Sequence, residues 1–253
     1  MGSSSDADPD EMRPGAENAV SQRPLPDLLC RHVGRSLPDG PVPRQVRITQ
    51  EGHMWQKPGG RAMRFTARQF FAVDRVAFSW QARFPVIGPM AIKVVDDYAD
   101  GDGKLEVRLL GLPIKRQRGP ETVVGEALRY LAELPWVPYA MAHNRELEWR
   151  ELDEWSVEVA AHVGGERLVV RVEFDAAGIV RTSSAMRRRK SGKAWVPTPW
   201  GGTFSEYKVL GGIRIPTAGQ AYWELPEGRY VYWRGTVTSV ELVAHPFRRS
   251  ASR

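Results

Sequence analysis

Residues 76–84, VAFSWQARF, alternate between two kinds of side chain without a break. One face of this stretch carries Val76, Phe78, Trp80, Ala82 and Phe84, and the other carries Ala77, Ser79, Gln81 and Arg83. Strict alternation is typical of a β-strand that packs one face on a core and turns the other towards water. The stretch therefore predicts a half-buried strand of the kind found in antiparallel sheets.

The same period of two recurs on both sides of this stretch, between turn signals. Alternating or short apolar runs occur at 46–48, 65–73, 92–94, 105–109, 157–163, 168–174, 179–186, 207–215, 221–225 and 230–243. Helices do not alternate with these runs, as a parallel sheet would require. We count about ten or eleven strands, and open twisted sheets rarely exceed about ten strands while they stay flat. The sequence thus predicts a mostly β fold, a strongly curved antiparallel sheet or half-open barrel.

Two irregular stretches lie near the end of the chain. The Pro/Gly-rich residues 197–202 predict a loop. In the last run the apolar positions change phase, from Val231 and Trp233 to Val240 and Leu242. A β-bulge between residues 235 and 239 would produce this change.

One segment in the middle of the chain has helical spacing. Residues 120–134, PETVVGEALRYLAEL, place an apolar stripe on one face, and Glu126, Arg129 and Glu133 line the opposite face. The apolar stripe consists of Val124, Ala127, Leu128, Leu131 and Leu134. Pro135 and Pro138 end the helix and permit about one further turn through residue 141. We expect this central helix to cover the concave face of the sheet.

The charges of this helix permit two interpretations. Arg129 and Glu133 are four residues apart, so they lie on one face and can pair. An amphipathic helix normally leaves such charges in water. If the helix covers the concave sheet, Arg129 could instead hold a carboxylate or carbonyl of a ligand bidentately, and Glu133 could act as an acid or base.

Large aromatic side chains line both cores and ligand pockets, because they combine apolar area with a polar group. Trp80 and Trp223 lie on alternating faces and are expected to point inward, whereas Trp200 in the predicted loop suits a pocket rim. The residues that we predict to contact a ligand are Trp80, Arg129, Tyr130, Glu133, Trp136, Trp200, Tyr207 and Trp223.

The acidic run at residues 96–103, DDYADGDG, suggests either a calcium loop or a turn. An EF-hand loop aligned on Asp100, Asp102 and Gly103 needs Glu at position 109, where Leu109 stands. We therefore favour a hairpin turn with solvated carboxylates, in which the glycines permit positive φ. The five histidines lack zinc-ligand spacing, and no phosphate-binding glycine motif is present, so we expect neither a metal nor a cofactor.

Composition and the chain ends set the remaining expectations. Residues 1–23 are polar and predict a disordered lead. A short helix is expected from Leu25 to Val33. Residues 24–245 are expected to form one curved-sheet domain, which is followed by a basic tail at 246–253. The net charge of +6 is concentrated partly in residues 187–190 and in the tail. We interpret these clusters as a charged loop and a frayed end, and expect no nucleic-acid partner. The single cysteine and the lack of a signal or of a transmembrane segment favour a soluble, cytoplasmic protein.

Five segments in a fixed order resemble an uncharacterised bacterial family of unknown function. They are VVDDYADGDG (94–103), ALRYLAELPWVP (127–138), TPWGGTFSEY (198–207), GGIRIP (211–216) and YVYWRGTVTSVE (230–241). The resemblance spans residues 40–243 and implies kinship without implying an activity.

The order of hairpins, central helix and late strand pair is also similar to that of periplasmic lipoprotein carriers and lipoprotein-sorting proteins. That likeness implies a half-open barrel whose apolar lining holds acyl chains. This sequence lacks their export signal and lipobox cysteine, so the likeness implies binding of some hydrophobic ligand rather than lipoprotein transport.

Three functions follow as hypotheses. The first is binding of a hydrophobic or amphipathic, lipid-like small molecule in the concave face. The second is an enzyme, a cyclase, isomerase or hydrolase of an apolar metabolite, that uses Arg129, Tyr130, Glu133 and Tyr207. The third is a structural or partner-binding role of the basic tail. We favour the first, since it does not require a reactive motif.

Overall fold

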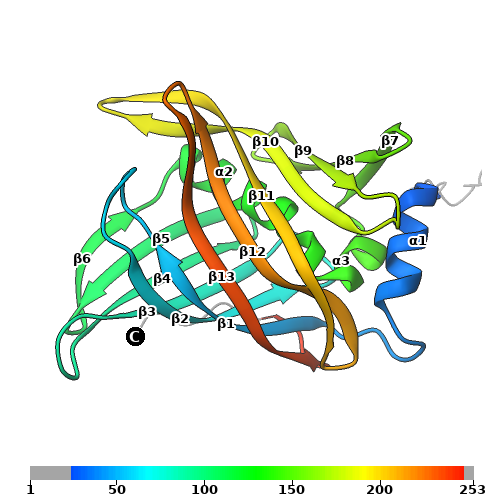
Figure 1. The fold of residues 1–253 in the computed structure, drawn as a ribbon, viewed down its shortest axis with the longest axis horizontal. Helices are drawn as coiled ribbons and strands as arrows, with labels where there is room; N and C mark the ends of the chain where they lie inside the picture. Colours follow the sequence, from blue (N-terminus) through cyan, green and yellow to red (C-terminus); the bar gives the residue numbers. More distant parts are fainter. Residues whose placement is uncertain (1–23, 248–253) are drawn as a thin grey trace, which may run out of the picture.

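Thirteen strands form one antiparallel sheet in the computed structural model, which describes residues 24–247 (Figure 1). The predicted lead at 1–23 and most of the predicted tail, 248–253, lie outside the described residues. The strands are β1 Gln45–Met54, β2 Met63–Ala72, β3 Phe78–Pro85, β4 Ala91–Ala99, β5 Asp102–Leu109, β6 Leu112–Gln117, β7 Glu148–Asp153, β8 Ser156–Val163, β9 Glu166–Phe174, β10 Val180–Ser191, β11 Ala194–Leu210, β12 Ile213–Leu225 and β13 Gly228–Val243.

The sheet order explains how a chain of hairpins becomes a curved wall. Strand β1 pairs with β13, so the first and last strands meet in the middle of the sheet, while β6 and β7 form its two edges. The sheet curls through 230° as a half-barrel. The predicted mostly β, strongly curved antiparallel fold is confirmed, with more strands than the predicted ten or eleven.

The helices cross the space between the two edges. Helix α2 spans Pro120–Ala132, the short 3₁₀ helix η1 spans Leu134–Trp136, and α3 spans Pro138–His143. Because this segment connects β6 to β7, it passes over the concave face, where α2 contacts β4, β5, β8, β9 and β10 (Figure 1). The predicted central helix is confirmed, although it ends at residue 132 rather than 134.

Helix α1 spans Asp27–Ser36 and packs near α3. The sequence places this helix two residues too early, at Leu25 to Val33. Pro26 is the N-cap, outside the helix, because its ψ of 145° is extended rather than helical. The helix also continues through Gly34, which has open space around it and does not end it.

Two edge strands and the first part of the long strand β11 were not predicted. Strands β6 and β7 are mostly exposed, so they lack the apolar alternation by which buried strands are recognised. Residues 197–202, predicted as a loop, belong to β11. Pro197 and Pro199 are tolerated because this part of β11 pairs with β10 alone, which leaves a free edge for residues without an N–H group.

The phase change in β13 has the predicted cause. Thr49 of β1 lies opposite Ser239, but the next residue, Gln50, lies opposite Val237. Thr238 is therefore the extra residue of a β-bulge, which shifts every later side chain of β13 by one position. The predicted bulge is confirmed.

Candidate functional site

The charged face of α2 points into the protein. Only 14% of the Arg129 side chain and 16% of the Glu133 side chain are exposed, and Glu126 is buried as well. The expectation that these charges stay in water is wrong, because the helix crosses the concave face and its charged stripe meets the sheet. The predicted pair between Arg129 and Glu133 is confirmed, with 2.8 Å between Nε and Oε1.

Arg129 is held from four sides. Its Nη1 lies 2.7 Å from Oδ2 of Asp96 on β4, and its guanidinium lies over the rings of Phe78 and Trp80 on β3, about 5 Å from each centroid. The second oxygen of Glu133 accepts a hydrogen bond from the Gln69 side chain on β2. The cation is thus enclosed by two carboxylates and two aromatic faces.

A row of side chains across three strands supplies these partners. Gln69, Trp80 and Asp96 lie directly opposite one another on β2, β3 and β4, so all three point to the concave face. Trp80 also donates a hydrogen bond from its indole to Gln50 on β1. The inward position of Trp80 is as predicted, but Gln69 and Asp96 were not predicted. Gln69 is a polar interruption of an otherwise apolar face, and that interruption is the signal that could have identified it.

Asp96 was assigned to a solvated hairpin turn, and this is wrong. Only Asp100 and Gly101, both with positive φ, form the turn between β4 and β5. Asp96 and Asp97 belong to β4, and Asp97 is completely buried beside Lys104, with 3.1 Å between Oδ2 and Nζ. The described residues contain no group of three or more His, Cys, Asp or Glu side chains that could hold a metal ion.

A second buried cation lies beside the first. Arg187 of β10 packs over the Trp200 ring at 4.7 Å, and its Nη2 lies 3.6 Å from Oε1 of Glu126. Residues 187–190 are therefore part of a strand and not a charged loop. Trp200 is only 4% exposed and donates to the Tyr232 hydroxyl, so its predicted place at a pocket rim is wrong. Trp223 lies opposite Trp200, with 6.4 Å between the ring centroids and the rings tilted by 50°, as an inward residue should.

These five charged groups, which we call the charged cluster, consist of Asp96, Glu126, Arg129, Glu133 and Arg187. They carry three carboxylates against two guanidiniums. Burial and the nearby Asp96 together raise the pKa of Glu126 to about 8, although Arg187 opposes this shift. Burial likewise raises the pKa of Asp96, although Arg129 and Arg187 oppose this shift. At neutral pH Glu126 therefore keeps its proton, which lowers the negative charge beside Arg187.

The other predicted residues lie apart from the charged cluster. The Tyr207 hydroxyl donates to the carbonyl of Val180, and its ring contacts His32 and Arg214. None of these contacts involves Arg129 or Glu133. Trp136 is buried, and its indole donates to the carbonyl of Pro216. The four side chains of the enzyme hypothesis are thus not brought together.

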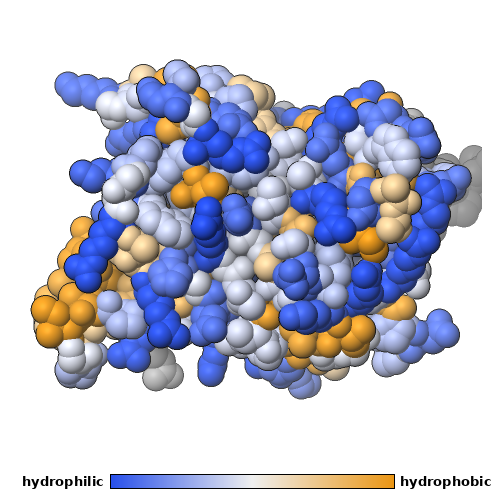
Figure 2. All heavy atoms as spheres, viewed as in Figure 1, coloured by the Kyte–Doolittle hydropathy of each residue, from blue (hydrophilic) through white to orange (hydrophobic). Residues whose placement is uncertain are grey.

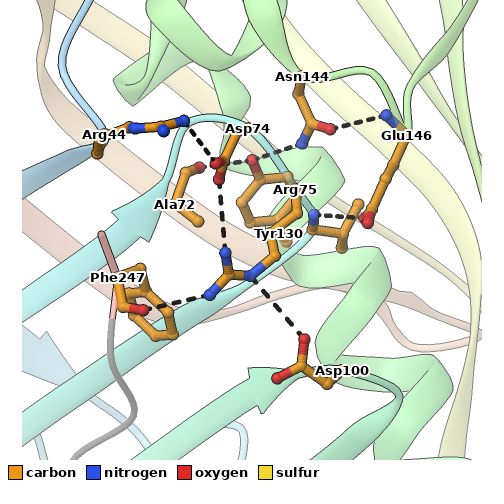
Figure 3. A network of polar contacts seen from close by, with 10 residues as sticks. Arg44, Ala72, Asp74, Arg75, Asp100, Tyr130, Asn144, Glu146 and Phe247 are labelled. Carbon is orange, nitrogen blue, oxygen red and sulfur yellow. Dashed lines mark hydrogen bonds and ion pairs between the residues drawn. The ribbon is translucent and has the colours of Figure 1, made fainter. Parts of the chain in front are cut away.

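Tyr130 belongs to a different network of polar contacts, which includes no member of the charged cluster (Figure 3). Its hydroxyl donates to the carbonyl of Ala72 and accepts from the amide of Asn144. Glu146 continues the network, because its backbone N–H donates to Asn144 and its carboxylate accepts from the N–H of Val76. This network fixes the segment that follows α3 against the turn between β2 and β3.

A cavity of about 850 Å³ opens beside this network. Its walls come from the turns β2–β3 and β4–β5 on one arm of the sheet and from the α3–β7 segment and β8 on the other. Buried apolar side chains form its floor, namely Val76, Tyr98, Met141 and Val163. We call this space the mouth cavity. None of the eight residues predicted to contact a ligand lines it, so their ligand contacts stay a prediction.

The rim of the mouth cavity is charged. Arg150 and Arg167 both pair with Glu158, and Arg167 also pairs with Glu148. Arg145 is exposed and has no ion-pair partner among residues 24–247. The cavity therefore combines an apolar floor with one cation at its edge, Arg145, that forms no ion pair with the described residues.

Comparison with solved structures finds similar folds at low identity. A LolA superfamily protein from Nitrosomonas europaea is 10% identical, with 87% of this chain and 93% of that chain covered and a TM-score of 0.47. A putative outer membrane lipoprotein-sorting protein domain from Vibrio parahaemolyticus is 12% identical, with 85% and 90% covered and a TM-score of 0.46. None of the curated proteins matches this chain.

No helix within residues 24–247 is long and apolar enough to cross a membrane. The cytoplasmic location stays a prediction. The resemblance to an uncharacterised family is confirmed, because a family model matches most of the chain. The chain belongs to the family of unknown function DUF6544, whose model matches residues 17–235.

Proposed function

We propose that this protein binds a hydrophobic or amphipathic small molecule in the mouth cavity. The observation that carries the proposal is the cavity itself, whose volume of about 850 Å³ lies within the range of small-molecule sites, roughly 300–1,000 Å³. Its floor is apolar and its rim is charged, which is the lining expected for a ligand with one apolar and one polar end.

The surroundings of the cavity support a site that exists before the ligand arrives. Asn144, which lines the cavity, is buried and fixed by its hydrogen bond to Tyr130. Val76 in the floor is fixed through its N–H group by Glu146. A wall whose side chains are already ordered loses little conformational freedom on binding, and this favours affinity.

The charge at the rim supports a ligand with an anionic end. The guanidinium of Arg145 has five donors in a planar arrangement that suits a carboxylate, sulfonate or phosphate. The neighbouring Arg150 and Arg167 are already paired with carboxylates. Arg145 is therefore the group that we assign to the polar end of the ligand.

Native mass spectrometry and solvent extraction of the purified protein test whether it retains a small molecule. Titration with the fluorescent amphiphile anilinonaphthalene sulfonate then tests the site. Ala142 lines the cavity on α3, and Ala142→Trp should fill part of the space and weaken binding about tenfold, equivalent to ~1.4 kcal/mol. Arg145→Glu should weaken binding of this anionic probe but not of its uncharged parent amine.

Ala194→Trp, at the exposed start of β11 and outside the lining of the mouth cavity, is the matched control and should bind like the unchanged protein. Circular dichroism and thermal unfolding verify that each variant is folded. Equal affinity of all variants, together with no retained molecule, would refute the proposal. No observation favours the enzyme hypothesis, which stays an untested prediction.

A further inference from the structure

Six large apolar side chains are exposed together at one end of the sheet. They come from the turn between β3 and β4, from the turn between β5 and β6 and from the start of β6. The two turns lie side by side because β4 pairs with both β3 and β5. Figure 2 shows them as the hydrophobic area at the lower left, where Figure 1 draws these turns. The residues of this apolar tip are Val86, Ile87, Met90, Leu110, Leu112 and Ile114.

The apolar tip does not serve the fold. Ile87, Leu110 and Leu112 are each about 70% exposed, with exact values of 72%, 69% and 71%. Turns normally use Gly, Asn, Asp or Ser beside proline, whereas these turns read PVIGPM and LGLPI. Contiguous apolar surface of this kind marks a site of contact with another surface.

A row of cations lies next to the apolar tip, on the same three strands. Arg83, Lys93 and Arg108 lie opposite one another on β3, β4 and β5, on the face away from the core. Like charges in this position destabilise a sheet. Arg108 pairs with Glu106 and Arg83 donates to a turn carbonyl, but Lys93 has no ion-pair partner within the described residues.

We propose that the apolar tip docks on the surface of an anionic lipid bilayer. The tip side chains would enter the boundary between headgroups and acyl chains, while the cation row would meet the lipid phosphates. The net charge of +6 acts in the same direction. A second copy of this chain is a poorer occupant, because a symmetric contact would bring the two cation rows together. The tip is separate from the mouth cavity, so docking does not depend on the proposed ligand site.

Vesicle flotation tests this proposal with the full chain. The unchanged protein should float with vesicles of phosphatidylcholine and phosphatidylglycerol, but not with phosphatidylcholine alone. Ile87→Asp combined with Leu112→Asp should abolish flotation, and Lys93→Glu should reduce it. The matched control is Val209→Asp combined with Trp155→Asp, which changes two exposed apolar residues away from the tip and should float normally.

Ala142→Trp in the mouth cavity should also float normally, and this separates docking from ligand binding. Failure of the unchanged protein to float with anionic vesicles would overturn the proposal. Equal flotation of the tip variant and the control would overturn it too. If light scattering instead showed a dimer that only the tip variant lost, without any flotation, the tip would be a contact between copies.

Discussion

Nη1 of Arg129 lies 2.7 Å from Oδ2 of Asp96, so the middle of α2 is fixed to the inner face of β4 across the concave interior. Each of the two side chains is only 14% exposed. A buried ion pair contributes little compared with an apolar pair, but removal of one partner leaves a buried charge without compensation. The pair therefore makes the position of α2 sensitive to single substitutions.

Arg129→Met should lower the free energy of unfolding by about 3–5 kcal/mol, because Asp96 and Glu133 lose their common cation. Arg129→Lys should cost less, since it keeps the charge but not the forked geometry. Urea denaturation measures both. Arg116→Met is the control, because Arg116 pairs with Glu106 at the surface and its loss should cost only about 0–1 kcal/mol. Equal losses for Arg116→Met and Arg129→Met would contradict the prediction.

Tyr130→Phe should lower the free energy of unfolding by about 1–3 kcal/mol, since Asn144 and the carbonyl of Ala72 would lose a buried partner. It should also loosen the wall of the mouth cavity, which amide hydrogen exchange around residues 144–147 would detect. Tyr139→Phe provides the comparison, because Tyr139 is buried and its hydroxyl makes no hydrogen bond within residues 24–247. A Tyr130 variant as stable as the Tyr139 variant would argue against the network.

The curved sheet was predictable because its central strands carry the alternation that burial of one face imposes. Residues 76–84 show this most clearly, and the bulge in β13 was predictable for the same reason, since it breaks the alternation. The edge strands β6 and β7 were not predictable, because an exposed strand does not need apolar side chains at every second position. Pro197 was a misleading signal, since a proline ends a central strand but not a strand with a free edge.

The candidate site was less predictable than the fold. The pairing of Arg129 with Glu133 follows from helical spacing alone. Their partner Asp96 does not, because its contact depends on where the helix lies on the sheet. The mouth cavity is formed by turns and chain segments from five parts of the sequence. No local sequence pattern indicates that these segments lie close together in the fold.

Substitution of Gly52 by alanine should lower the stability of the protein, whereas substitution of Gly34 by alanine should raise it. A Cβ at Gly52 would overlap the carbonyl oxygen of Arg234 on β13, so Gly52→Ala should force β1 and β13 apart. Gly34 lies within α1 with nothing near it, and Gly34→Ala should raise the free energy of unfolding by about 0.5–1 kcal/mol. Thermal unfolding measures both changes. A Gly52→Ala protein of unchanged stability would show that β1 and β13 approach less closely.

The proton on Glu126 should make stability depend on pH. Its pKa is 4.5 in an ordinary setting and about 8 in the folded protein, so the folded state holds a proton that the unfolded chain releases between these values. The free energy of unfolding must then fall as pH rises through this window. His32 opposes this below pH 6.5, because burial lowers its pKa from 6.5 to about 4. Between pH 6.5 and pH 8 the unfolding free energy still changes through Glu126 but no longer through His32.

Across that upper window the unchanged protein should lose on the order of 2 kcal/mol of unfolding free energy, because the raised pKa spans about 1.5 units there. Glu126→Gln should remove most of this slope, since the amide keeps the shape of the protonated acid and cannot ionise. Urea denaturation at a series of pH values measures the slope, with Glu151→Gln as an exposed control that should keep it. Parallel slopes for Glu126→Gln and the unchanged protein would mean that Glu126 is ionised beside Arg187.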